Sequence, residues 1–192
     1  MDLSFEDKFN IEVEAAEVEK AINKFKDIAQ SRKGDVEILK RCFSMIDLTT
    51  LNTTDGYERG KLFAEKVSQF PNQFPGMPNV AAICVYPSLV AAVKENLSAP
   101  SVKIASVAAG FPASQTFLEI KLSECEMALE QGADELDVVI SVGSFLEGDY
   151  FTVFSELQQI KEVAENAKVK VILETGALPS LEDIKLASLL AM

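Results

Sequence analysis

The sequence predicts an α/β fold in which buried parallel strands alternate with helices, and it favours a (β/α)8 barrel over a doubly wound open sheet. Three observations support this prediction. Five β-rich runs recur between helical patterns, as in βαβ units. The runs are almost continuously apolar, as expected for strands buried on both faces. No Gly-x-Gly-x-x-Gly opens a helix after the first strand, whereas carboxylates lie within strands, where a barrel places the polar side chains of its site.

The first expected element is a helix. An amphipathic helix is predicted over residues 12–30, because apolar residues recur there at helical spacing: Val18, Ile22, Phe25 and Ala29. The chain has 192 residues, which is enough for one substantial core, and no linker or low-complexity segment divides it. We therefore expect an N-terminal helical extension over residues 1–40 and a single barrel domain over residues 41–192.

The barrel domain should contain five strands, over residues 42–48, 80–86, 102–107, 135–140 and 169–174. Helical patterns lie between them, over residues 55–70, 87–97, 116–131 and 149–166. A last helix should begin at Ser180 with a capping box, in which the Ser180 hydroxyl accepts from the backbone N–H of Asp183 and the Asp183 carboxylate reaches back. Five units fall short of eight, and the sequence stops within a helical pattern, so we expect a truncated barrel with about five βα units.

The charge balance indicates which partners to expect. The net charge is −12, from 18 Lys and Arg against 30 Asp and Glu. This disfavours nucleic acid, because phosphate contacts need clustered basic side chains. No apolar run approaches the ~18 residues that suggest a membrane span, and the acidic N-terminus is unlike a secretory signal. We expect a cytoplasmic protein that binds neither nucleic acid nor membranes, with a homo-oligomer as one open alternative.

The sequence contains no histidine, which removes the commonest general base and the commonest zinc ligand. No spacing of other metal ligands occurs, so we expect no metal. The three cysteines, Cys42, Cys84 and Cys125, are isolated in apolar surroundings and are predicted to be reduced core residues. Any catalysis must therefore use Asp, Glu, Lys, Tyr, Cys or Thr.

Carboxylates within the strand runs are the first candidates for that chemistry. Asp137 lies in the middle of its run, and Glu135 lies two residues earlier on the same face. A buried Asp is often satisfied by backbone donors or by a neighbouring lysine, but two close carboxylates raise one pKa and suit proton transfer. Asp47 is expected to close the first strand, where barrels place site residues. Asp and Thr at strand ends, here followed by Thr49 and Thr50, also stabilise turns.

Lysines and one cysteine are the remaining candidates. Lys170 and Glu174 should share one strand face, where a lysine can be a nucleophile, the partner of a carboxylate or a phosphate contact. Alternatively it extends into solvent from a strand end, which is the interpretation we favour for Lys103. Cys84 could line the site, but it is a poor nucleophile without a nearby base. Glycine-bearing loops follow two strands and either approach a ligand or are only turns: residues 108–112 and 174–176.

Five motifs, taken in order, resemble those of deoxyribose-phosphate aldolases: IDLTTLN, AAICVYP, SVAAGFP, GADELDVVISVG and VKVILETG. The resemblance covers about residues 41–192. It implies a (β/α)8 barrel that reversibly cleaves the sugar phosphate 2-deoxyribose 5-phosphate to glyceraldehyde 3-phosphate and acetaldehyde, in deoxyribonucleotide catabolism and without a metal or cofactor. In such enzymes a lysine amine forms a Schiff base, and the iminium accepts electrons during carbon–carbon cleavage.

The resemblance also implies roles for individual residues. Asp137 is the expected catalytic acid–base residue that relays protons, Asp47 belongs to the polar network around it, and Lys170 and Cys84 line the pocket. The family's Schiff-base lysine lies on the sixth strand in a Phe-Ile-Lys-Thr-Ser-Thr-Gly type motif, which these 192 residues lack. Also missing are its second lysine, on strand seven, and its phosphate loops, after strands seven and eight. Two interpretations remain: part of an aldolase that is inactive alone, or a non-catalytic product that assembles with another chain.

Overall fold

The computed structural model describes residues 10–192, so the first nine residues of the expected extension lie outside the described residues. Five parallel strands form one sheet in the order β1-β2-β3-β4-β5, so each strand pairs with the next along the chain. This is the order of a barrel wall, whereas a doubly wound sheet reverses its order at a switch point. The predicted barrel-type fold with five βα units is confirmed by the strands Asp47–Thr49, Ala82–Val85, Lys103–Ala108, Glu135–Val139 and Lys168–Ile172.

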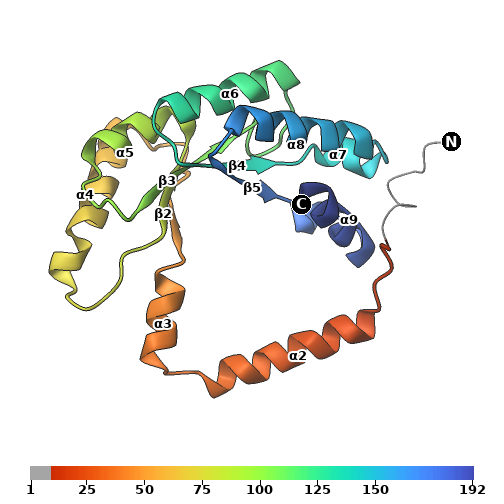
Figure 1. Ribbon diagram of the computed structural model, residues 1–192, viewed down its shortest axis with the longest axis horizontal. Coiled ribbons are helices and arrows are strands. Elements are labelled where there is room, and N and C mark those ends of the chain that lie inside the picture. The colour runs from red at the N-terminus through yellow and green to blue at the C-terminus, as the bar shows by residue number, and fades with distance from the viewer. Residues whose placement is uncertain (1–9) are drawn as a thin grey trace.

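Helices cover the outer face of this sheet (Figure 1). The expected helices are present, and the last one begins as predicted, because the Ser180 hydroxyl accepts from the backbone N–H of Asp183 at 3.0 Å. The Asp183 carboxylate accepts from that hydroxyl at 2.5 Å. A short helix after β4 was not expected. The helices are α4 (Tyr57–Gln73), α5 (Val90–Asn96), α6 (Leu118–Glu130), α7 (Val142–Leu146), α8 (Tyr150–Ala164) and α9 (Leu181–Ala191), with 3-10 turns η1 (Pro87–Leu89) and η2 (Thr175–Ala177).

The start of the first predicted strand is wrong. Residues 42 and 43 end a helix, α3 (Val36–Phe43), which Asp35 initiates by accepting hydrogen bonds from the backbone N–H groups of Glu37 and Ile38. Cys42 is therefore exposed on a helix instead of buried in the core, whereas Cys84 and Cys125 are buried as expected. Asp47 begins β1 and does not close it.

The two faces of the sheet differ in the size and polarity of their side chains. Large aliphatic residues of the outer face, such as Ile83, Ile104 and Leu136, are at most 2% exposed beneath the helices. The opposite, concave face carries a small cluster of short residues: Ala82, Cys84, Ala105 and Val107. Short side chains leave room above them, so the concave face can hold longer polar groups from neighbouring strands.

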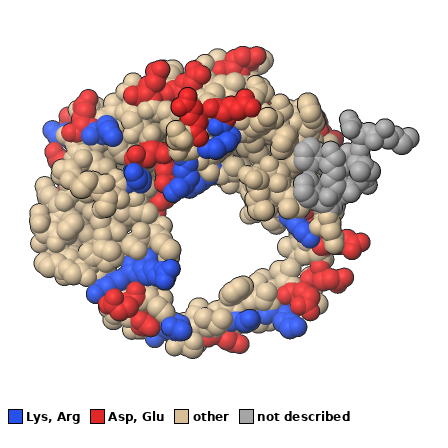
Figure 2. Space-filling model, viewed as in Figure 1, with Lys and Arg blue, Asp and Glu red and all other residues tan. Residues whose placement is uncertain are grey.

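The N-terminal helix is confirmed as α2 (Ala15–Ser31), but it contributes no buried residue. Together α2 and α3 form an arm that runs from the region of α9 to the start of β1 (Figure 1). The arm and the sheet surround an opening (Figure 2). The far end of the arm is held by Ile11, which packs on the core, and by Lys185, whose ammonium donates to the Glu12 carbonyl at 3.0 Å. Within residues 10–192 no helix is long and apolar enough to cross a membrane.

Candidate active site

The concave face gathers five side chains from four strands, here called the concave cluster: Asp47, Cys84, Glu135, Asp137 and Lys170. Strand alternation places Glu135 and Asp137 on one face, as predicted from their spacing of two. The parallel register sets Asp137 directly beside Lys170 on the next strand. All four residues proposed from the sequence for catalysis or for lining the site therefore meet in one place.

Lys170 is the centre of the concave cluster. Its ammonium nitrogen lies 2.9 Å from Asp137 Oδ1 and 3.2 Å from Glu135 Oε2, and it donates a short hydrogen bond to Asp47 Oδ2. Asp47 belongs to β1 and Lys170 to β5, which are the two edges of the sheet. In a flat sheet these edges would lie about 19 Å apart, so the contact requires a strongly curved sheet with the cluster on its inner side.

The carboxylates set the charge of Lys170. Partial burial by itself lowers the pKa of an ammonium, but the hydrogen bond that Lys170 donates to Asp47, together with the close contact and negative charge of Asp137, outweighs it and raises the pKa of Lys170. The amine is therefore an ammonium at neutral pH and is held as a counterion. Glu174, expected on this face, instead lies beyond the end of β5 with a left-handed backbone and an exposed side chain.

Burial acts on the Cys84 thiol in the opposite sense. Burial and the charge of Asp137 raise its pKa to about 12, so the group stays protonated. The thiol donates to Asp137 Oδ2 across 3.6 Å. Cys84 thus lines the site as a weak hydrogen-bond donor, which agrees with the expectation that it is a poor nucleophile.

Asp137 has one oxygen available for further chemistry. Its Oδ1 atom is buried and lies 2.9 Å from the ammonium nitrogen of Lys170. No well-aligned hydrogen bond reaches this oxygen from residues 10–192. A buried oxygen of this kind can accept a hydrogen bond or a proton from a bound molecule. Glu135 differs, because burial raises its pKa but the hydrogen bonds from Lys168 and Lys170 lower it by more.

Several neighbouring polar residues have local structural roles. The Thr50 hydroxyl donates to Asp55 Oδ2 at 2.7 Å and so stabilises the turn after β1, which matches the turn interpretation of this segment. The Thr49 hydroxyl donates to the carbonyl of Asp47, at 3.0 Å. Lys103 lies at the start of β3 with its side chain 55% exposed beside Asp134, as favoured from its position.

Sequence reasoning missed a second polar group on the outer side of the sheet. Lys121 was not among the candidates from the sequence, yet it is 1% exposed and pairs with Glu156 at 2.9 Å. Its position in α6 could have revealed this, because Lys121, Cys125 and Ala128 follow the spacing of one helix face and are the buried residues of α6.

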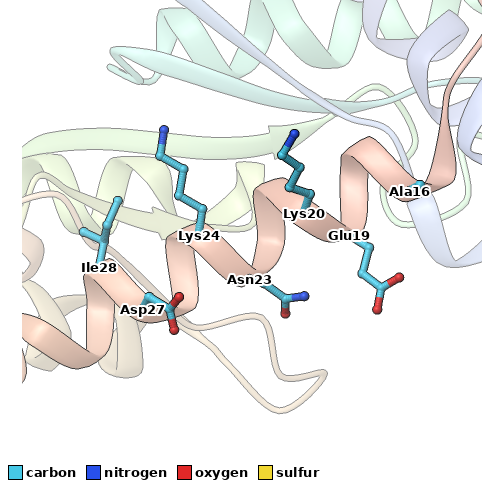
Figure 3. Close-up of a pocket in the computed structure, with 7 residues that line it drawn as sticks. All are labelled: Ala16, Glu19, Lys20, Asn23, Lys24, Asp27 and Ile28. Atoms are coloured by element: carbon cyan, nitrogen blue, oxygen red, sulfur yellow. The ribbon is translucent and has the colours of Figure 1, made fainter.

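A groove of 660 Å³ along α2 carries no comparable chemistry. Figure 3 shows Lys20, Lys24 and Ile28 pointing to one side of the helix, whereas Glu19, Asn23 and Asp27 point to the other. Lys20 pairs with Glu17 at 3.6 Å with both side chains over 70% exposed, which makes a contact of small energy. Among the described residues, no three His, Cys, Asp or Glu side chains come together in a way that could hold a metal ion.

Comparisons with known proteins identify the family. Residues 43–184 match the family model described as DeoC/LacD family aldolase. The human protein named deoxyribose-phosphate aldolase is 36% identical over 164 residues, which is 80% of this chain and 52% of that protein. Its namesake from Thermococcus gammatolerans is 46% identical over 112 residues, or 56% of this chain and 49% of that protein.

A solved structure supports the same assignment. The structure titled as a unique tetrameric structure of deoxyribose phosphate aldolase from Aeropyrum pernix has 28% sequence identity and a TM-score of 0.63. The superposition covers 79% of this chain and 61% of the Aeropyrum pernix chain. The chain thus spans about half of the human and archaeal proteins that it matches in sequence. On the family match over residues 43–184 and these similarities, the chain belongs to the DeoC/LacD aldolase family.

Proposed function

We propose that the concave cluster is the proton-handling part of a Schiff-base aldolase that acts on 2-deoxyribose 5-phosphate. The observation that carries the proposal is the position of Asp137, whose buried Oδ1 faces the concave side without a well-aligned donor. In Schiff-base formation an amine adds to the substrate carbonyl and water leaves, and both steps need a group that gives and takes protons. Asp137 fills that role in the proposal, and it does so without a cofactor.

Lys170 and Asp47 support this role by fixing charge. The ammonium of Lys170 places a positive charge 2.9 Å from Asp137 Oδ1, and Asp47 holds that ammonium from the opposite edge of the sheet. Cys84 adds one weak donor to the second oxygen of Asp137. These contacts fix the direction in which the Asp137 carboxylate points, which is what a proton relay requires.

Lys170 is not the Schiff-base nucleophile in this proposal. A nucleophilic amine needs a depressed pKa, and the carboxylates around Lys170 shift its pKa upward. Lys121 is likewise engaged, by Ser141 and Glu156. In this proposal the nucleophile comes from residues that correspond to the part of the relatives that this chain does not cover.

Borohydride trapping tests the proposal. We expect no specific adduct when the 192-residue chain is incubated with 2-deoxyribose 5-phosphate or acetaldehyde and then reduced. The chain co-expressed with the uncovered part of the human relative should trap one adduct, on a lysine of the added part. Stoichiometric trapping on Lys170 in the chain alone, located by peptide mass spectrometry, would refute the assignment of Lys170 as a counterion.

A further inference from the structure

A polar pocket of 320 Å³ lies where the loops after β3 and β4 meet α6, α7 and α8. This is the carboxyl-terminal edge of the sheet, on which barrel proteins build their binding sites. The pocket is separate from the concave cluster, because its residues come from the loops and outer helices. Six of its lining residues matter for what it can bind: Ser114, Gln115, Lys121, Ser141, Glu147 and Glu156.

A closed triangle of hydrogen bonds forms one wall of the pocket. The Lys121 ammonium donates to Ser141 Oγ at 2.7 Å and to Glu156 Oε2 at 2.9 Å, and the Ser141 hydroxyl donates to the same Glu156 oxygen at 2.6 Å. Lys121 is 1% exposed and the Glu156 side chain 15% exposed. The triangle therefore neutralises the buried ammonium and holds the wall rigid without using the rest of the pocket.

Ser114 contributes a polar group with no such partner. It is 4% exposed, and its hydroxyl makes no hydrogen bond within residues 10–192. Its backbone is left-handed, with φ of 56°, in a loop that also turns through left-handed conformations at Ala109 and Gly110. A non-glycine residue in this region costs free energy, and so does a buried hydroxyl without a partner. Both costs occur at one residue that lines the pocket.

The charges of the lining select the kind of ligand. Glu147 and Glu156 oppose the single ammonium of Lys121, which Glu156 already neutralises. An anion such as a sugar phosphate would meet the excess carboxylate of Glu147, whereas a cation would find only that one exposed carboxylate, whose charge solvent screens. Gln115 and the serine hydroxyls both donate and accept hydrogen bonds, and carboxylates accept only. A molecule whose own groups both donate and accept fits this set best, and a polyol has such groups.

We propose that this pocket binds a small neutral polyol, such as an unphosphorylated pentose, with the Ser114 hydroxyl as one of its contacts. Its volume is at the lower end of the range for small-molecule sites, which begins at about 300 Å³. The ligand would supply the hydrogen-bond partner that the Ser114 hydroxyl lacks within residues 10–192. The inference uses no residue of the concave cluster and does not depend on the proposed aldolase function.

Titration by heteronuclear NMR with free 2-deoxyribose and with ribitol tests the proposal. We expect saturable shifts for the amides of Ser114, Gln115 and Ser141 at millimolar concentrations of these probes. Ser114→Ala should weaken binding by about three- to tenfold, which is the effect of one hydrogen bond. The same substitution at Ser123, an exposed residue of α6 outside this pocket, should leave binding unchanged.

The stability of Ser114→Ala separates a ligand contact from a structural role. Its hydroxyl makes no hydrogen bond within the described chain, so its loss should leave the unfolding midpoint in urea unchanged or raise it. If this variant fails to fold, Glu147→Gln replaces it, because that side chain is exposed and its loss should also weaken binding. The proposal is overturned by shifts that do not saturate, by equal affinity in Ser114→Ala, or by preferential binding of inorganic phosphate or of an alkylammonium ion.

Discussion

The ammonium of Lys170 contacts three carboxylates, those of Asp47, Glu135 and Asp137. The pH dependence of stability in the concave cluster can be followed at one of them, Glu135. Lys168 adds a second ammonium, which lies 2.8 Å from Glu135 Oε1. The lysines therefore stabilise the ionised form of Glu135 in the folded protein, and its pKa is lowered. A group with a lowered folded pKa stabilises the fold above its unfolded pKa, about 4.3 for Glu, and this stabilisation is lost as the pH falls through the folded value.

We predict that Glu135→Gln lowers the free energy of unfolding by about 1 kcal/mol at neutral pH, a value that allows for the exposure of Lys168. The difference from the unmodified chain should shrink as the pH falls below about 4, where the carboxylate becomes protonated. Urea unfolding at a series of pH values measures this. A difference that stays constant down to about pH 3 would contradict the pKa shift of Glu135.

Asp137 allows a sharper test of function at the same scale. In the chain co-expressed with the uncovered part of the human relative, Asp137→Asn should keep the fold and lower turnover by roughly 10²-fold or more. The reason is that the amide keeps the shape of the carboxylate but cannot relay a proton. The matched control is Asp134→Asn, since Asp134 precedes the same strand and accepts a hydrogen bond from the backbone N–H of Ile104 at 2.9 Å. It should change stability and leave turnover near the unmodified value. Normal turnover in Asp137→Asn would show that Asp137 is structural.

At the scale of elements, the sequence predicted the five strands and the main helices because each has a strong local signal. Continuous apolar runs fix β2 to β5 to within two residues at each end, and the serine cap fixes the start of α9. The first run failed because its apolar residues include the end of α3, a helix that begins at the capping side chain of Asp35. Local apolarity does not distinguish the end of a short helix from the beginning of a strand.

The concave cluster could be predicted only in part from the sequence. Period-two alternation places Glu135 with Asp137, and the motifs add Asp47, Cys84 and Lys170. That Lys170 contacts Asp47 depends on the curvature of the whole sheet, because these residues are 123 positions apart on opposite edges. The position of Glu174 was wrong because strand alternation ends with β5 at Ile172. Long-range contacts of this kind have no local sequence signal.

The pairing of Lys121 with Glu156 ties α6 to α8, and we predict that it contributes strongly to stability. Glu156→Gln removes the counterion of a buried ammonium and should lower the free energy of unfolding by about 3 kcal/mol. Glu162→Gln on the exposed face of the same helix is the control and should change it by less than about 0.5 kcal/mol. The double variant Lys121→Met with Glu156→Leu should recover most of the loss, because it leaves no buried charge. Equal losses in the single and double variants, measured by urea unfolding, would argue against this explanation.

For the whole molecule, the sheet is curved but not closed. Both β1 and β5 are edge strands, and α2 spans the opening beside them without burying a residue of its own. The arm also exposes apolar side chains, with Phe25 66% exposed and Leu39 56% exposed. Open strand edges and exposed apolar residues both favour association with another chain.

We therefore predict that the 192-residue chain self-associates through its open sheet edges. The Lys168 N–H donates to the Asp134 carbonyl, and the Ile172 carbonyl accepts from the Ile140 N–H, so both residues direct their backbone polar groups toward β4. Because this direction alternates along a strand, the N–H groups of Val169 and Val171 point to the open edge. Val171→Pro removes one of these outward donors while keeping the β4–β5 hydrogen bonds, a position at which an edge strand tolerates proline. Size-exclusion chromatography with light scattering should show a mass that rises with concentration for the unmodified chain and less so for Val171→Pro. A monomer at every concentration, unfolding cooperatively in urea, would mean that the open edges are protected in solution by contacts within the chain.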